Sequence, residues 1–213
     1  MEANREAENV RFVARQSALA LNGAFGGLNV RRLEQFREIV LPQYPNIAPL
    51  PSTIPIVVFT NETGNITVTP QSITFNVAAG LFDVARAEDV YRHLDDAGLC
   101  PDLVAPALQV TRAASIVGIK ERFFHLLPWI QPPHGAIIGN GSRFAFKDER
   151  DGSTIDLTIE TDFQNDFGVI FSAKWGTDEA FATERAFALV RDAVTRVDEE
   201  LYPLMLRTIQ APQ

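Results

Sequence analysis

Three glycines stand between an apolar segment and a helical one in the stretch LNGAFGGLNVRRLEQF at residues 21–36. A strand, a glycine loop and a helix can hold phosphate through backbone N–H groups. The stretch lacks both the G-x-G-x-x-G spacing of a dinucleotide site and the lysine of a P-loop. It therefore predicts at most a weak anion site, at Gly26, Gly27, Arg31 and Arg32. The alternative is a turn that needs glycine for positive φ.

The side chains that most often carry catalysis are scattered along the chain. The three histidines, His93, His125 and His134, have no histidine four residues away, as helical zinc sites usually require. The single cysteine, Cys100, follows a helix end, where the helix dipole raises a thiol pKa. The acidic runs DERD and TDFQND are typical of solvated turns. We expect no catalytic residue, metal or cofactor, with a carboxylate pair acting as acid and base as the open alternative.

Charge and composition narrow the classes of partner. The 213 residues hold 19 Lys and Arg against 27 Asp and Glu, a formal charge of −8 that disfavours nucleic acids and anionic membranes. One cysteine allows no intramolecular disulfide, which favours a reducing cytoplasm. No segment approaches the ~18 apolar residues of a spanning helix, and the N-terminus lacks the apolar core of a signal peptide. We therefore expect a cytoplasmic protein.

The first half of the chain begins with a strand and a helix. Residues 10–21 alternate between apolar and polar types, which predicts a strand. Apolar residues within 33–40 recur on one side of a helix that Asn29 can cap and Pro42 can end.

A connector, a meander and a second helix follow. Residues 42–55 contain five prolines and are expected to run extended over the surface. Residues 55–78 read as three short strands separated by turns. Residues 85–97 predict a helix that Gly98 ends.

The second half repeats this order. A strand over 106–119 precedes a short helix over 120–130, and three strands then fall within 136–146, 153–163 and 167–175. The middle strand is the clearest, because apolar and polar residues alternate strictly along it. A long final helix is expected to start at Thr177, whose hydroxyl can cap it.

The repeated order predicts an α+β fold of two β-α-β-β-β-α repeats with a long C-terminal helix. The repeats would form two antiparallel sheets, or one continuous sheet covered by helices on one side. We place them at 1–100 and 101–213, either as two units or as one integrated domain. The alternative is that two ordinary halves share an element order by chance.

The order of the first half, with Phe36, Tyr44 and Pro45, resembles a sporadically distributed family of uncharacterised bacterial proteins of duplicated α+β architecture. The resemblance covers most of the chain, although QVTRAASIVGI stands where members carry a strand rich in Arg, Tyr and Asn. It implies a bacterial origin and the duplicated architecture. It implies no catalytic residues.

An apolar seam along the final helix is longer than one small sheet can cover, which favours contact with a partner. The residues of this predicted contact surface, with one tryptophan of the short helix, are Phe187, Val190, Val194, Val197, Leu201 and Trp129. Our first hypothesis is a non-enzymatic accessory protein that acts through protein contacts, as a complex subunit or a homo-oligomer. The alternative is an effector-sensing domain with a ligand cleft between the repeats, lined by Phe144, Phe146, Phe171 and Trp175.

Overall fold

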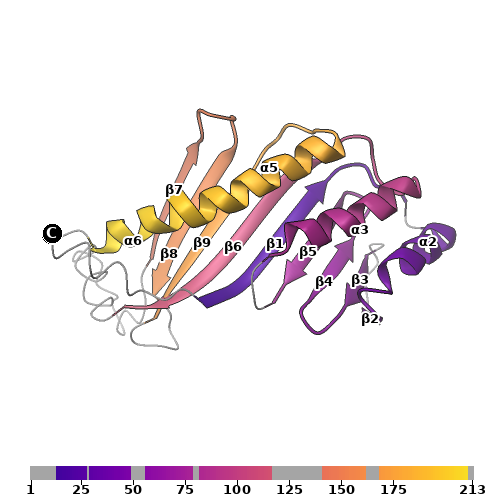
Figure 1. Ribbon diagram of the computed structural model, residues 1–213, viewed down its shortest axis with the longest axis horizontal. Coiled ribbons are helices and arrows are strands. Elements are labelled where there is room, and N and C mark those ends of the chain that lie inside the picture. The colour runs from indigo at the N-terminus through magenta and orange to yellow at the C-terminus, as the bar shows by residue number, and fades with distance from the viewer. Residues whose placement is uncertain are drawn as a thin grey trace, which may run out of the picture.

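The chain forms one nine-stranded antiparallel sheet with helices packed on it (Figure 1). The computed structural model describes residues 13–27, 29–48, 56–78, 82–116, 141–161 and 168–210. The strand order is β2-β3-β4-β5-β1-β6-β9-β8-β7. The expected α+β class is confirmed, and the sheet is the continuous one of the two arrangements considered.

The first part of the chain contributes five strands and two helices. These elements are β1 (Val13–Asn22), α2 (Val30–Val40), β2 (Asn46–Ala48), β3 (Val57–Thr60), β4 (Gly64–Val68), β5 (Ser72–Val77) and α3 (Val84–Asp96). The predicted cap of the first helix is confirmed, because the Asn29 side chain accepts a hydrogen bond from the Arg32 N–H at 3.0 Å. Gly98 has φ of +68° directly after α3, as expected of a glycine that ends a helix.

The second part contributes four strands and the long C-terminal helix. The elements are β6 (Ala105–Ser115), β7 (Gly141–Lys147), β8 (Thr154–Thr161), β9 (Gly168–Gly176), α5 (Thr183–Arg196), the π-helical turn η1 (Val197–Leu201) and α6 (Tyr202–Gln210). The short helix expected over 120–130 lies outside the described residues, and so do Trp129, His125 and His134.

The two parts join through the central strands of the sheet. β1 and β6 pair antiparallel, with Ala18 opposite Gln109 and Ala20 opposite Ala107. Outward from this junction the order is β1, β5, β4, β3, β2 on one side and β6, β9, β8, β7 on the other. On both sides the first strand along the chain lies innermost, and the last strand of that part of the chain lies beside it.

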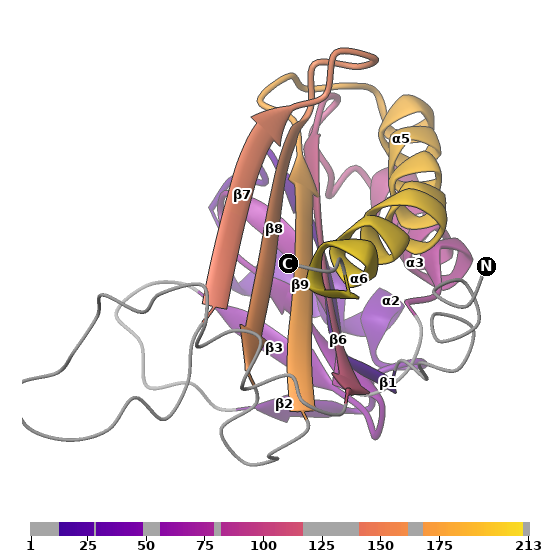
Figure 2. The ribbon, with the colours of Figure 1, turned by 90° about the vertical axis from the view of Figure 1, so that its left-hand side faces the viewer.

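Helices cover one face of the sheet and leave the other without helices in the part of the chain that the structure describes (Figure 2). The strict alternation predicted for the middle strand of the second half is confirmed in β8. Its residues Ile155, Leu157 and Ile159 are buried, whereas Asp156 and Thr158 are partly exposed. The residues facing away from the helices are mostly Ala, Ser, Thr, Asn and Gln on the inner strands, among them Ala20, Thr74, Asn76, Ala107, Gln109 and Ser172.

The C-terminal helix begins later than expected. We predicted a start at Thr177, but α5 begins at Thr183. Thr177 instead accepts a hydrogen bond from the Glu179 N–H at 3.1 Å within a turn. Phe181 then pairs with Val104 in an extended bridge, with backbone hydrogen bonds of 2.8 and 2.9 Å. This bridge requires extended backbone at Phe181, so the helix cannot form before it.

One π-helical turn interrupts the long helix. The Tyr202 N–H bonds to the Val197 carbonyl, five residues back, and the additional residue rotates the helix beyond this point. As a result Leu201, Tyr202 and Met205 all remain buried against the sheet. The rotation keeps an apolar face on the sheet along the entire helix.

The two edges of the sheet differ in length and composition. β2 has three residues, Asn46–Ala48, and the sequence places Pro45 and Pro49 on either side of it. We had expected an extended surface connector in this region, and β2 is an extended strand within it. β7 at the other edge has seven residues and no proline.

Candidate interaction site at the β7 edge

The edge strand β7 is the most exposed strand of the sheet. Within the described residues it pairs with β8 alone. Six of its seven residues are exposed, and Ser142 is partly exposed. Phe144 and Phe146 have 47% and 41% of their surface exposed. Large apolar side chains are usually buried, so two exposed ones on a strand that is an edge among the described residues make it the candidate site.

The backbone of β7 presents hydrogen-bonding groups on its outer side. The Asp148 N–H donates to the Ser153 carbonyl at 2.8 Å, which makes these two residues a hydrogen-bonded pair next to the strand. Hydrogen-bonded pairs alternate with non-hydrogen-bonded pairs along an antiparallel ladder. Phe146 and Phe144 lie two and four residues before Asp148, so their backbone groups also point toward β8. Those of Arg143, Ala145 and Lys147 point outward.

The side chains of β7 divide between the two faces of the sheet. Phe144 lies opposite Leu157 and Phe146 opposite Ile155, so both phenylalanines are on the helix-covered face. Arg143, Ala145 and Lys147 lie on the opposite face. The edge is thus apolar on one side and basic on the other.

Arg143 is neutralised by its neighbour on β8. Its Nε lies 2.9 and 3.1 Å from the two carboxylate oxygens of Asp156. The hydrogen bonds from Arg143 hold the pKa of the Asp156 carboxyl below its ordinary value, although burial opposes them. The charge of Arg143 is therefore satisfied within one chain.

Lys147 and Glu160 carry opposite charges at the two ends of the same edge. Neither makes a hydrogen bond or ion pair with any residue that the structure describes. Glu160 lies on β8 opposite Gly141, and its Cγ is 2.8 Å from the position that a Cβ on Gly141 would occupy. The Glu160 side chain therefore lies over Gly141, toward the outer edge.

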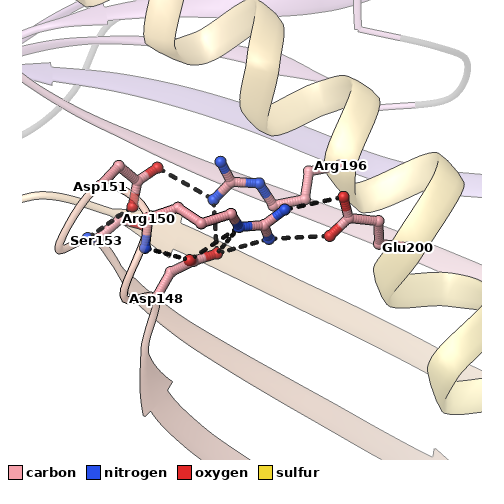
Figure 3. A network of polar contacts seen from close by, with 6 residues as sticks. All are labelled: Asp148, Arg150, Asp151, Ser153, Arg196 and Glu200. Carbon is pink, nitrogen blue, oxygen red and sulfur yellow. Dashed lines mark hydrogen bonds and ion pairs between the residues drawn. The ribbon is translucent and has the colours of Figure 1, made fainter.

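The turn after β7 is fixed to the C-terminal helix by an ion-pair network (Figure 3). Arg150 donates to both carboxylate oxygens of Asp148, at 3.0 and 2.8 Å, and to those of Glu200 on η1, at 3.0 and 2.9 Å. Arg196 on α5 donates to Asp148 at 2.9 Å and to Asp151 at 3.1 Å. The network connects the β7–β8 hairpin to the helix across the edge of the sheet.

The charges of this network shift the pKa values of its carboxyl groups. Hydrogen bonds from the Arg150 side chain, together with the nearby Arg196 charge, lower the pKa of Asp148 to about 2 against the opposing effect of burial. The Arg150 hydrogen bond also lowers the pKa of Glu200. Carboxylates held ionised in this way are poor general acids or bases near neutral pH. We interpret the network as structural.

A second set of contacts fixes the π-helical turn to β6. Arg112 pairs with Asp198 of η1, and its guanidinium carbon lies 4.5 Å from the centre of the Tyr202 ring. The Tyr202 hydroxyl donates to the Val110 carbonyl at 3.1 Å. Asp198 and Tyr202 thus both contact Arg112 of β6, whereas Glu200 contacts Arg150 of the turn after β7.

The predicted contact seam of the final helix is covered by the chain itself. Phe187, Val190, Val197 and Leu201 are buried in the core, and Val194 is half-buried against it. A partner cannot reach these side chains in the folded protein. Contact through the surface must therefore use other residues.

Among the described residues, the four aromatic side chains predicted to line a ligand cleft lie in two separate places. Phe171 and Trp175 are buried in the core, whereas Phe144 and Phe146 are exposed on β7. All four side chains share the helix-covered face of the sheet, but β8 lies between the two pairs. Phe144 and Phe146 belong to the edge site instead.

The glycine loop positions Arg32 inside the fold. Gly26 has φ of +74°, which favours glycine. The Arg32 guanidinium donates to the Phe25 carbonyl at 2.8 Å and to the Leu99 carbonyl at 3.0 Å. Arg32 thereby ties the loop to the residues that follow α3. Arg31 and Gly27 are exposed beside it.

The pKa of the Cys100 thiol is raised, as expected from the sequence, but the main cause is burial and not the helix dipole. Burial is the largest contribution and raises the pKa of Cys100 to about 12. The side chain is partly buried and its sulfur lies 3.9 Å from the Tyr91 carbonyl oxygen. A nucleophilic role at neutral pH is disfavoured.

No protein-family model and no curated protein matches this chain. The resemblance to a bacterial family therefore stays a prediction. Among the residues that the structure describes, no helix is both long and apolar enough to cross a membrane.

Two features of this site were missed from the sequence. The run DERD was interpreted as a solvated turn, but Asp148 is only 7% exposed and lies in the ion-pair network. Its partner Arg196 is 48 residues away, so no local pattern indicates the pair. The sequence assigns Phe144 and Phe146 to a ligand cleft. Their place on an edge strand depends on the order of the strands in the sheet, which the sequence does not indicate.

Proposed function

We propose that this protein is a non-enzymatic accessory protein that acts through protein contacts, as a complex subunit or a homo-oligomer, and that β7 is its contact strand. The observation that supports this proposal is the seven-residue edge with outward backbone groups and two exposed phenylalanines. An added strand would satisfy the backbone groups of Arg143, Ala145 and Lys147. The exposed rings of Phe144 and Phe146 would pack against its side chains.

The contrast between the two edges favours this role for β7. Proteins protect free edges with short strands, proline and charge, because an open edge pairs with other chains. The β2 edge has three residues between prolines. β7 is longer, has no proline, and its Arg143 is already neutralised by Asp156. Its exposure is consistent with a strand that pairs in the assembled state.

An internal duplication also supports strand addition at β7. If the matching strand orders reflect two repeats, β3 is the equivalent of β7. The outer edge of β3 is occupied by β2, with Ile47 opposite Phe59. In the first repeat, a strand is therefore already paired at the position that corresponds to the outer edge of β7.

The effector-sensing alternative has less support. A cleft between repeats would need a gap at their junction, but β1 and β6 pair directly there. Two of the four aromatic residues assigned to the cleft are buried in the core.

An affinity experiment with matched variants tests the proposed contact strand. The wild-type chain, Phe146→Glu and Ile47→Glu serve as baits in an extract of the source cells. Phe146 on β7 and Ile47 on β2 have almost equal exposure, 41% and 42%, at opposite edges. We expect the same bound protein, either a partner or a further copy of this chain, with the wild type and Ile47→Glu but not with Phe146→Glu. Equal retention by all three baits contradicts the proposal.

A further inference from the structure

We infer that the strand added to β7 is β7 of a second copy, paired antiparallel about a twofold axis at Phe144. This inference rests on the proposed contact role of the edge and names its partner. The two sheets would join into one across the axis. The backbone, charges and aromatic side chains of the edge each favour this register.

The backbone groups match across this axis. An axis at Phe144 places Arg143 opposite the partner's Ala145, and Ala145 opposite the partner's Arg143. Both residues direct their backbone groups outward, as a hydrogen-bonded pair requires. These two central pairs alone form about four hydrogen bonds between the copies. Phe144 meets the partner's Phe144 as a pair without hydrogen bonds, where side chains approach most closely.

The charges at the ends of the edge match in the same register. Lys147 lies opposite the partner's Gly141, which carries no side chain. The partner's Glu160 extends over that glycine, so its carboxylate meets the Lys147 ammonium across the interface. The twofold axis generates two such ion pairs. Neither residue has a charged partner among the described residues of its own chain.

Neighbouring registers bring like charges together. An axis at Ala145 places Arg143 opposite the partner's Lys147, and an axis at Arg143 places two arginines opposite each other. Like charges directly opposite one another destabilise a strand pair, although the Arg143–Asp156 ion pair reduces this cost, and in both registers Lys147 no longer lies opposite the partner's Gly141. The axis at Phe144 places neither Arg143 nor Lys147 opposite a like charge, and it places Lys147 beside the partner's Glu160.

The aromatic side chains complete the contact. The two copies of Phe144 pack across the axis, and Phe146 lies diagonal to the partner's Phe144. Such diagonal neighbours lie within reach of aromatic rings. The exposed apolar surface of both copies is buried together, which accounts for its presence at an edge.

Single cysteines locate the axis directly. In a Cys100→Ser background, Phe144→Cys places two thiols with Cα atoms about 4.5 Å apart, within the range of a disulfide. In this register residue 146 lies opposite the partner's Ser142, four residues away from the partner's residue 146. The Cα atoms of the two cysteines in Phe146→Cys are therefore about 14 Å apart. We expect a cross-linked dimer under mild oxidation from Phe144→Cys and none from Phe146→Cys. Cross-linking of Phe146→Cys alone, or of both at equal rates, overturns the register.

A charge exchange identifies the occupant as a second copy. Light scattering with size-exclusion chromatography should show a dimer for the wild type and dissociation, by tenfold or more in dimer affinity, for Lys147→Glu and for Glu160→Lys. The double variant should dimerise again, because Glu at position 147 of one copy can then form an ion pair with Lys at position 160 of the other. Ala145→Pro, which removes an outward N–H, should be monomeric, and Ala145→Val should remain a dimer.

The outcomes separate this inference from the proposed function. A wild-type chain that is monomeric at every concentration overturns the second copy, while the bait experiment still decides whether β7 binds another protein. Failure of the double variant to dimerise when both single variants dissociate also overturns the inference. Loss of the bait contrast contradicts the proposed function, and with it this inference, which rests on that role; a dimer that then persists forms through another surface.

Discussion

Arg196 on the C-terminal helix donates a hydrogen bond of 2.9 Å to the carboxylate of Asp148, the residue that follows β7. Both side chains are largely buried. Arg150 approaches the same carboxylate from the turn and connects it onward to Glu200. The edge strand is therefore held by the helix through this network as well as by β8, so the helix contributes to the position of the proposed contact surface.

Removal of Arg196 should destabilise the protein. Arg196→Met keeps most of the apolar stem but leaves Asp148 and Asp151 without one of their donors. We expect the free energy of unfolding in urea to fall by roughly 1–3 kcal/mol. Arg185→Met is the matched control, because Arg185 is exposed on the same helix and forms no ion pair with a described residue. Equal stability of the two variants would show that the network contributes little.

Acid should weaken the same contacts. The pKa of Asp148 is about 2 in the folded chain, below the ordinary value of 3.8, so the unfolded chain binds more protons between these values. The stabilisation is complete above about pH 5 and is lost as the pH falls through 4 toward 2. We expect the Tm of the wild type to decline over this interval. Asp148→Asn should start lower at pH 7 and decline less.

Other carboxylates contribute to the same acid dependence. Asp156 and Glu200 also have lowered pKa values, so Asp148→Asn should reduce the slope without abolishing it. Circular dichroism measurements of Tm between pH 2 and 7, on the wild type and on Asp148→Asn, test this prediction. Parallel curves for the wild type and Asp148→Asn would assign the acid dependence to other groups.

Local patterns predicted the elements whose structure depends on local contacts. The alternation in β8 follows from one buried and one exposed face, and the cap at Asn29 is a contact over three residues. The class of fold followed from the order of such elements. These features need no knowledge of distant partners.

Features that depend on distant partners were not predictable in this way. Thr177 followed by acidic residues looks like a helix start, but the bridge between Phe181 and Val104 keeps that segment extended. β2 is a strand only because β3 lies beside it. Exposure of Phe144 follows from the place of β7 at the end of the strand order. In each case a tertiary contact decides between local alternatives.

The glycine loop provides a test that separates backbone geometry from anion binding. Gly26 has φ of +74°, whereas an added Cβ on Gly27 would meet no atom within 4 Å and its φ is not positive. Gly26→Ala should lower the free energy of unfolding by about 1–2 kcal/mol, and Gly27→Ala should leave it unchanged. If the loop serves only to place Arg32 against the Phe25 and Leu99 carbonyls, inorganic phosphate should not raise the Tm of the wild type or of either variant. A rise in Tm with phosphate that both substitutions abolish would instead establish the anion site.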